Sequence, residues 1–250
     1  MLKRKKILVL GDSLAMPRKD PGEVPVHWED TWPQILGAEL GILDYEVINA
    51  SRRAYESCFL QEDFQEHVVF KHPNIVILQI GVVDGAPRIV SKADRRLFSR
   101  FFFPKFLATQ VIAHRKRNRR RLVATNPLKK VYTAPESFER LRAEFLGKCR
   151  NFNPNIGIIQ IPILAHTALM DEISPGYSSN ISLYNSIICR LDGQFGLTSF
   201  PVAEFYSRRF PKQFLSDGYH LSVEGNIAIV DALKGVFFER SCVASTATIP

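Results

Sequence analysis

Short apolar runs that alternate with stretches of helical spacing constrain this chain more than any other feature of its sequence. The clearest run spans residues 74–80, and residues 155–161 repeat its pattern up to a closing proline, Pro162. Continuous apolar runs of this length are typical of strands that are buried on both faces of a parallel sheet. The expected strands are 6–10, 45–48, 74–80, 155–161 and, more weakly, 200–205, and the expected helices lie near 30–40, 56–70, 135–149, 179–195 and 223–240.

The alternation of strands and helices predicts an α/β fold. We expect a three-layer α/β/α sandwich around a central, mostly parallel five-stranded sheet. A length of 250 residues fits a single domain over residues 1–240, with an insertion at about 86–130. Residues 241–250 are rich in Ser, Thr and Ala, which predicts a flexible tail.

The sequence shows no segment suited to membrane crossing, export or cofactor binding. No apolar run reaches the roughly 18 to 20 residues that cross a bilayer, and the run 7–10 is too short for a signal-peptide core. We therefore expect a cytoplasmic protein. The four cysteines are widely separated, which predicts neither a zinc site nor a disulfide framework. Because the chain lacks metal-ligand spacing and a phosphate-cradling glycine loop, we expect neither a metal nor a cofactor.

The positive charge of the chain is concentrated in residues 92–130. The net charge is +8, and this segment carries thirteen basic side chains but only one acidic one, Asp94. Five phenylalanines lie among these charges at near-helical spacing. Such a segment is typical of a solvated insertion, of a helix that contacts an anionic membrane or lipid-linked substrate, or of nucleic-acid binding. The run 115–121 contains no aromatic residue and no nucleic-acid fold signature surrounds it, so we expect no nucleic-acid partner.

Two blocks near the ends of the chain carry side chains suited to nucleophilic catalysis. Ser13 ends a Gly-Asp-Ser block directly after the first expected strand, where a tight turn would expose its hydroxyl. A serine hydroxyl needs a base that takes its proton, and this base is usually a histidine held by a carboxylate. Asp217 and His220 can form such a pair on one turn before the last helix. Each block alone also fits a simpler interpretation, in which its polar side chains cap a helix.

The order and placement of these blocks resemble the SGNH, or GDSL-type, serine hydrolase family over residues 6 to about 238, outside the insertion. That family has a Gly-Asp-Ser block near its amino terminus and an Asp-x-x-His block near its carboxyl terminus, which residues 11–13 and 217–220 match. The resemblance implies a flavodoxin-like sandwich, with Ser13 as nucleophile, His220 as general base and Asp217 as its orienting partner. It also implies ester substrates such as acetylated sugars, lipid esters, thioesters and small aryl esters.

The family block after the second strand is partly preserved in this chain. Asn49 is kept, whereas Ser51 and Ala54 stand where the family usually has glycines. Alanine retains a backbone N–H, so Ala54 is expected to supply the oxyanion donor that the family draws from this position. We therefore predict that both Asn49 and Ala54 lie at the substrate-binding edge.

The family block after the third strand departs further from the pattern. Gly81 and Asp84 are kept as candidate site residues, but Val83 replaces the family's oxyanion-binding asparagine unless the block is shifted by one residue. Loss of one such donor typically costs about 2.7–4 kcal/mol of transition-state stabilisation. Asp84 could instead hold loop N–H groups. Side chains from nearby loops that could replace the donor or contact an acidic substrate are Arg52, Arg88, Asn126 and His166.

Together these features predict a serine ester hydrolase that forms an acyl-enzyme on Ser13 and acts on a small-molecule or glycan ester. The basic insertion favours an anionic acylated glycan or a lipid-linked ester, because its field would concentrate such molecules. Acyl transfer to a sugar hydroxyl would use the same three residues and is one alternative. The second alternative, motivated by Val83, is a catalytically weakened binding or scaffold protein in glycan or membrane assembly.

Overall fold

A five-stranded, all-parallel sheet forms the centre of the computed structural model, which describes residues 4–19, 22–41, 44–91, 94, 105–125, 131–207 and 210–246. The strand order is β2-β1-β3-β4-β5, and each neighbouring pair is parallel. This arrangement confirms the predicted α/β fold class. The strands are β1 (Lys5–Gly11), β2 (Tyr45–Asn49), β3 (Ile75–Gln79), β4 (Gly157–Gln160) and β5 (Thr198–Ser199).

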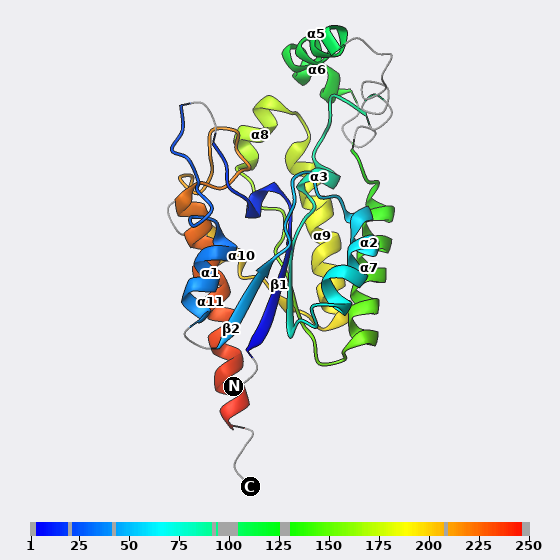
Figure 1. The fold of residues 1–250 in the computed structure, drawn as a ribbon. Coiled ribbons are helices and arrows are strands. Elements are labelled where there is room, and N and C mark those ends of the chain that lie inside the picture. Colours follow the sequence, from blue (N-terminus) through cyan, green and yellow to red (C-terminus); the bar gives the residue numbers. More distant parts are fainter. Residues whose placement is uncertain are drawn as a thin grey trace.

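The apolar runs of the sequence become the buried middle of this sheet. Every residue of β3 is buried, and so are the residues of β1 from Ile7 onward. Both strands carry apolar side chains on their two faces because helices cover both sides of the sheet, as Figure 1 shows. The register pairs Val9 of β1 with Asn49 of β2 and Ile77 of β3, so the carboxyl ends of these strands lie at one edge.

Helices form an outer layer on each face of the sheet (Figure 1). The helices of one layer are α1 (Trp32–Leu40), α10 (Val202–Ser207) and α11 (Val223–Thr246); those of the other are α2 (Leu60–Asp63), α7 (Pro135–Phe152) and α9 (Tyr177–Phe195). In α1, Trp32, Leu36 and Leu40 are buried at the spacing of one helical face. Thr31 occupies the N-cap of α1, and the carboxylate of the preceding Asp30 accepts the backbone N–H of His27.

Three of the expected elements differ from the structure. The fifth strand is only Thr198–Ser199, and α10 replaces the expected strand at 200–205 because Pro201, whose fixed φ suits a helix start, accepts the N–H of Phe205. The helix expected at 56–70 is divided into the 3-10 turn η3 (Ser57–Phe59), α2 and the π-helical segment η4 (Phe64–Val69). Helix α11 continues to Thr246, so the expected tail is helical over 241–246.

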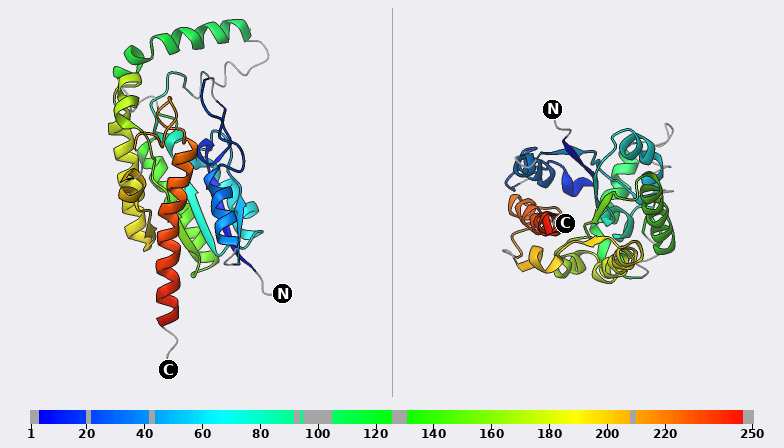
Figure 2. Two further views of the ribbon diagram at one scale, coloured as in Figure 1. Left: turned by 90° about the vertical axis from the view of Figure 1, so that its left-hand side faces the viewer. Right: turned by 90° about the horizontal axis from the view of Figure 1, so that it is seen from below.

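Part of the basic insertion lies beyond the carboxyl ends of the strands, as Figure 1 and the left-hand view of Figure 2 show. It contains α5 (Lys105–Arg117) and α6 (Arg119–Ala124), and it follows the short helix α3 (Val82–Gly85). The phenylalanines at 98 and 101–103 and the residues 126–130 lie outside the described part of the chain. No helix of the described residues has the length and apolar character needed to span a bilayer.

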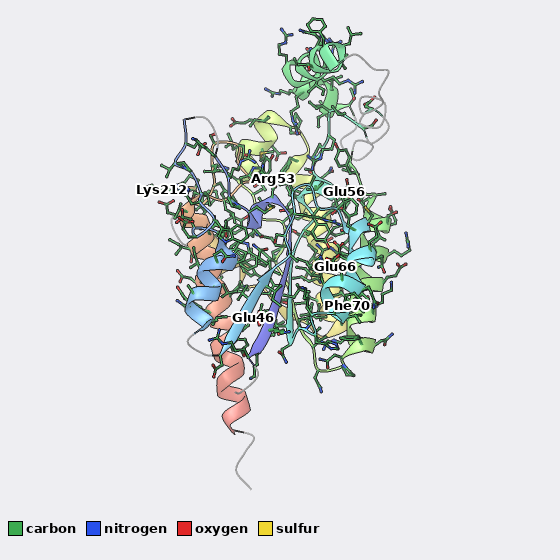
Figure 3. All side chains as sticks on the ribbon, viewed as in Figure 1. Glu46, Arg53, Glu56, Glu66, Phe70 and Lys212 are labelled. Atoms are coloured by element: carbon green, nitrogen blue, oxygen red, sulfur yellow. The ribbon has the colours of Figure 1, made fainter. Side chains whose placement is uncertain are left out.

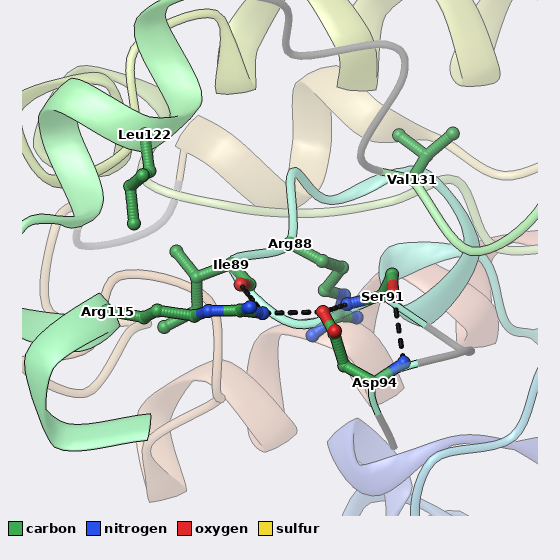
Figure 4. Close-up of a pocket in the computed structure, with 7 residues that line it drawn as sticks. All are labelled: Arg88, Ile89, Ser91, Asp94, Arg115, Leu122 and Val131. Carbon is green, nitrogen blue, oxygen red and sulfur yellow. Dashed lines mark hydrogen bonds and ion pairs between the residues drawn. The ribbon is translucent and has the colours of Figure 1, made fainter. Parts of the chain in front are cut away.

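Within the insertion, an ion pair joins α5 to the segment that follows α3. The Arg115 Nη1 lies 2.5 Å from the Asp94 Oδ2 and also donates to the Ile89 carbonyl at 3.2 Å. Asp94 in turn exchanges hydrogen bonds with Ser91, which Figure 4 shows beside a cavity of about 300 Å³. These contacts hold α5 against the segment that follows α3.

Candidate active site

Ser13 lies on a sharp turn directly after β1. The turn is the 3-10 helix η1 (Ser13–Ala15), and the buried Asp12 is its N-cap residue. The Asp12 Oδ1 accepts the N–H of Leu14 at 2.9 Å, while the Asp12 N–H donates to the carbonyl of Gln79 at 3.0 Å. These two bonds fix the turn to β3 and direct the partly exposed Ser13 away from the core.

Asp217 and His220 lie on the loop that precedes α11. The Asp217 Oδ1 accepts the backbone N–H groups of Tyr219 at 3.2 Å and His220 at 3.0 Å, while its Oδ2 lies 2.5 Å from the His220 Nδ1. The imidazole is almost fully buried, and the ring of Tyr219 packs against it at a tilt of 39°, with centroids 4.2 Å apart. The ring is therefore held on two sides.

The structure brings these two distant blocks together. The Ser13 Oγ lies 3.0 Å from the His220 Nε2. Because a carboxylate only accepts, the Nδ1 carries the proton toward Asp217, and the Nε2 of a neutral ring is then free to accept from Ser13. Burial raises the pKa of Asp217, but the hydrogen bonds from His220 and the backbone outweigh it and lower the pKa overall. A continuous proton path therefore joins the three side chains.

Sequence reasoning missed Arg18, which completes this cluster. Its Nη1 lies 2.9 Å from the His220 Nε2, and its Nη2 lies 3.3 Å from the Asp217 Oδ2. The backbone of Arg18 forms a two-way bridge with Val26, which ties down the irregular loop after η1. A basic residue shortly after Ser13 was the only signal in the sequence that could have found it.

Asn49 and Ala54 shape the loop after β2. The Asn49 Nδ2 donates to the carbonyl of Ala15 at 3.4 Å, and its Oδ1 accepts the N–H of Ser51 at 3.0 Å. Ala54 has a φ of +57°, the left-handed region that favours glycine. Among the residues that the structure describes, no acceptor takes the Ala54 N–H. Figure 3 labels its neighbour Arg53 at the end of the sheet where β1 also ends.

Gly81 and Asp84 build the turn after β3. Gly81 has a φ of +137°, and a Cβ there would meet the Ile163 side chain at 2.9 Å, so glycine is required. The buried Asp84 carboxylate accepts the backbone N–H of Ser57 at 3.0 Å and the hydroxyl of Thr133 at 2.5 Å. Asp84 therefore joins three loops, in accordance with the structural alternative. Val83 is buried beside it and has no side-chain donor.

The candidate substitutes for the missing donor lie in different places. Arg52 pairs with Asp63 at 2.9 Å and covers the ring of Tyr55. The Nδ1 of His166 caps α8 (Thr167–Ile173) by accepting the N–H of Leu169 at 3.3 Å. Asn126 lies outside the described residues. Of the three candidates that the structure describes, Arg88 alone lines a cavity that Asp217 also borders.

Three ionisable side chains are buried close to the turn that carries Ser13. Burial raises the pKa of Asp12 to about 7, against the hydrogen bond from Leu14. Burial raises the pKa of Asp84 as well. Burial lowers the pKa of Arg142 to about 10, and the nearby negative charge of Asp84 opposes this shift. Asp12 is thus an acid that is easily neutralised beside the candidate nucleophile.

The described residues contain no group of three His, Cys, Asp or Glu side chains arranged to hold a metal ion. The arrangement of Ser13, His220 and Asp217 can by itself move a proton from a hydroxyl to an imidazole. That chemistry suits attack on an ester carbonyl.

Comparisons with known proteins find solved structures of similar fold. No protein-family model matches this sequence, and no curated protein matches it. A protein from Parabacteroides merdae described as a GDSL-like lipase is 14% identical, with a TM-score of 0.62, over 92% of this chain and 94% of its own. The lipase/acylhydrolase from Enterococcus faecalis is 15% identical, with a TM-score of 0.59, over 92% of this chain and 96% of its own.

A third solved structure is a variant of an acetyl-xylooligosaccharide esterase from Geobacillus stearothermophilus. It is 15% identical, with a TM-score of 0.60, over 92% of this chain and 92% of its own. These likenesses extend over almost the whole chain. The protein therefore has the fold of the SGNH, or GDSL-type, hydrolases.

Proposed function

We propose that this protein is a serine ester hydrolase that forms an acyl-enzyme on Ser13. The observation that carries the proposal is the hydrogen-bonded series from Ser13 through His220 to Asp217, with distances of 3.0 and 2.5 Å. Both distances fall within the range that a nucleophile and its base require. The esterase and lipase names of the structural neighbours support the same reaction class.

The proposed reaction begins when the Ser13 Oγ attacks the ester carbonyl. Its proton passes to the His220 Nε2, and Asp217 stabilises the resulting imidazolium through Nδ1–H. The imidazolium then protonates the leaving alcohol as the ester bond breaks, which leaves an acyl group on Ser13. A water molecule attacks this acyl group and gives a proton to the same nitrogen. The imidazolium then returns this proton to the Ser13 Oγ as the acyl–serine bond breaks, so the acid is released and the Ser13 hydroxyl is restored.

The negative charge of the tetrahedral intermediate needs donors beside Ser13. The backbone N–H of Ser13 begins a short helix and has no intrahelical acceptor, and the Ala54 N–H is a second candidate. We propose that Arg18 compensates for Val83. Its guanidinium shares the His220 Nε2 with the Ser13 hydroxyl, so it lies beside the reacting oxygen. When the imidazole takes the serine proton, its nitrogen ceases to accept from the Arg18 Nη1, which can then donate to the oxyanion while Nη2 stays beside Asp217.

The substrate class that we propose is an acylated carbohydrate or a lipid-linked ester. An acetyl-xylooligosaccharide esterase is among the structural neighbours, which supports a carbohydrate ester. Whether the acyl group passes to water or to a sugar hydroxyl depends on which acceptor the site admits. Product analysis with and without a free oligosaccharide separates the two outcomes, because only transfer yields a newly acylated sugar.

A serine-directed fluorophosphonate probe and 4-nitrophenyl acetate test the proposal. Wild-type protein should be labelled and should hydrolyse the ester, and Ser13→Ala should abolish both. The control is Ser186→Ala, which removes an exposed hydroxyl on α9 whose described partner is a helix carbonyl. A wild type that is never labelled and cleaves no short-chain ester would favour the catalytically weakened binding protein.

We further propose a cytoplasmic location with peripheral contact to an anionic membrane surface through the insertion. Phe106 is 70% exposed and Leu107 48% exposed at the start of α5, and Arg115 and Arg117 lie on the same helix. Apolar and cationic side chains on one helix suit the interface of an anionic bilayer. Vesicles of phosphatidylglycerol should bind the protein more strongly than neutral vesicles do, and co-sedimentation measures the bound fraction. Phe106→Ala should weaken this binding, whereas Phe70→Ala, at an exposed phenylalanine on the far end of the sheet (Figure 3), should not.

A further inference from the structure

A cavity of about 190 Å³ adjoins the Asp217–His220 loop. Its walls come from α3, α6, α8 and α9, which Figure 1 shows near the carboxyl-end edge of the sheet. Asp217 and Tyr219 border it, and the ring of Tyr219 packs against the imidazole of His220. The cavity is therefore continuous with the wall of the candidate active site.

Two arginines line this cavity from different segments. The Arg88 Nη2 donates to the carbonyls of Val82 at 3.1 Å and Val83 at 3.0 Å, and the Arg119 Nη2 donates to the carbonyl of Pro87 at 3.0 Å. In both residues the Nε is buried and has no hydrogen-bond partner. Among the described residues, neither guanidinium forms an ion pair with a carboxylate. Two cations that line one cavity, and that pair with none of the described carboxylates, favour an external anion.

Tyr177 adds a third donor to the same cavity. Its side chain is fully buried, and its hydroxyl has no hydrogen-bond partner. A buried hydroxyl without a partner is costly, so such groups usually meet a ligand or water. Burial raises the pKa of Tyr177, which keeps the hydroxyl protonated and able to donate.

The nearby carboxylate does not satisfy these donors. The Asp217 Oδ1 accepts two backbone N–H groups, and its Oδ2 contacts His220 and Arg18. The cavity thus presents two guanidinium groups and one hydroxyl to whatever enters it, and the one acid at its border is already engaged. This donor set matches the oxygens of a carboxylate or a phosphate.

We propose that Arg88, Arg119 and Tyr177 form a subsite for an anionic group of the ester substrate. The inference rests on the proposed function, and it gives the substrate class as an ester that carries a carboxylate or a phosphate. It also assigns a role to the insertion, because Arg119 belongs to α6. The Ser174 hydroxyl of the segment after α8 accepts from Arg119 at 3.2 Å and helps to hold its guanidinium at the cavity.

Diffuse attraction by the basic insertion is the competing explanation for any preference for anions. Substitutions in α6 distinguish the subsite from a diffuse field, because Arg120 and Arg121 are exposed and follow Arg119 directly in sequence. Arg119→Gln and Arg120→Gln remove the same charge from the same helix. Only the first removes a donor from the cavity, so Arg120→Gln is the matched control.

Two ester pairs test the subsite. The phosphate pair is 1-butyrylglycerol 3-phosphate against 1-butyrylglycerol, and the carboxylate pair is mono-4-nitrophenyl succinate against 4-nitrophenyl butyrate. The readout is the ratio of kcat/KM for the anionic ester to that for its neutral partner. Arg119→Gln should lower this ratio about ten- to a hundred-fold in the pair whose anion reaches the cavity, as expected for one charge-assisted hydrogen bond. Arg120→Gln should leave the ratio near the wild-type value.

Tyr177→Phe tests whether Arg119→Gln acts only by disturbing α6, because Tyr177 lies outside α6 and this change removes one hydroxyl while the buried ring remains. It should lower the same ratio several-fold. Equal ratios for wild type, Arg119→Gln and Tyr177→Phe in both pairs would overturn the subsite. So would an equal fall in Arg119→Gln and Arg120→Gln, which would indicate a diffuse field.

The subsite and the proposed function can fail separately. If the wild type hydrolyses neutral esters and shows no preference for their anionic partners, the proposed subsite is wrong. The proposed esterase function is then still supported. Calorimetric titration of Ser13→Ala with 1-butyrylglycerol 3-phosphate and with mono-4-nitrophenyl succinate measures binding without turnover. If the wild type cleaves no ester, but one of these ligands binds Ser13→Ala and this binding is lost when Arg119 is also replaced, the subsite is supported and the esterase function is wrong. Absence of both turnover and binding would overturn both.

Discussion

The Ser13 Oγ lies 3.0 Å from the His220 Nε2, although 207 positions separate the two residues in the chain. The contact forms because Ser13 follows β1, an inner strand of the sheet, and His220 precedes α11, which packs beside α1. A parallel sheet gathers the loops that follow its strands at one edge. Residues from the two ends of the sequence therefore meet at the same place.

Asp217→Asn should reduce the kcat for ester hydrolysis by about 10⁴-fold, the loss typical of this change in a Ser-His-Asp triad. The new amide can donate to the His220 Nδ1, which forces the ring into the tautomer whose Nε2 cannot accept from Ser13. The Oδ1 that holds the N–H of Tyr219 and His220 remains, so the loop should keep its shape. Steady-state kinetics with 4-nitrophenyl acetate measures the effect.

Asp231→Asn, which weakens a long contact to Lys234 on α11, is the control for that prediction. Retention of more than about a tenth of the wild-type rate in Asp217→Asn would show that the carboxylate does not orient His220. Circular dichroism of both variants checks that the fold is intact.

The sequence predicts the fold class and the meeting of Ser13, His220 and Asp217 because these depend on local patterns. Apolar runs such as 74–80 become buried strands wherever helices cover both faces, and their order along the chain places the loops. The two blocks could be paired because their residue types have complementary chemistry. Neither inference requires the path of the loops between elements.

Arg18 and Arg119 could not be predicted as site residues because their positions depend on irregular segments. Arg18 reaches His220 only because its loop bridges to Val26, and no periodicity marks that bridge. Arg119 enters the cavity only because α6 packs near α8. The short β5 was missed for a related reason, since two residues leave almost no pattern.

Arg18→Ala should lower the kcat for a neutral ester by about 10²–10³-fold with a much smaller change in KM, as expected when one oxyanion donor is lost. The physical reason is that Val83 cannot donate, so the cation beside the reacting oxygen carries more of the stabilisation. Full kinetic curves with 4-nitrophenyl acetate separate kcat from KM.

Arg53→Ala provides the control for Arg18, because Arg53 is an exposed arginine at the same edge whose Nη2 donates to the Pro17 carbonyl. A faster Arg18→Ala enzyme would contradict the prediction. It would indicate that the guanidinium only competes with the Ser13 hydroxyl for the His220 Nε2.

Ala54→Gly should raise the free energy of unfolding by roughly 0.5–1 kcal/mol. The left-handed φ of +57° costs an alanine about 1–2 kcal/mol, and the greater backbone freedom of glycine in the unfolded chain cancels part of the gain. Ala38→Gly in the middle of α1 should have the opposite sign, with a loss of about 1 kcal/mol. Urea denaturation measures both, and a loss of stability in Ala54→Gly would show that the turn is not strained.

Asp12→Asn should change how stability depends on pH. Burial raises the pKa of Asp12 from 3.8 to about 7, so between these values the unfolded chain has lost a proton that the folded chain still holds. The free energy of unfolding of the wild type therefore falls as pH rises through this window, by an amount on the order of 4 kcal/mol from this group. The penalty is absent below pH 4 and complete above about pH 7.

Asn cannot ionise, yet its amide oxygen can still accept the N–H of Leu14. The difference in unfolding free energy between Asp12→Asn and wild type should thus be smallest near pH 4 and grow toward pH 8 in favour of the variant. Urea titrations at each pH give this difference, with Glu46→Gln, an exposed carboxylate on β2 (Figure 3), as the control. Parallel stability curves for Asp12→Asn and wild type would mean that Asp12 ionises in the folded protein as readily as in the unfolded chain. In that case the acid beside Ser13 is charged at neutral pH, and it would compete with the oxyanion for nearby cations.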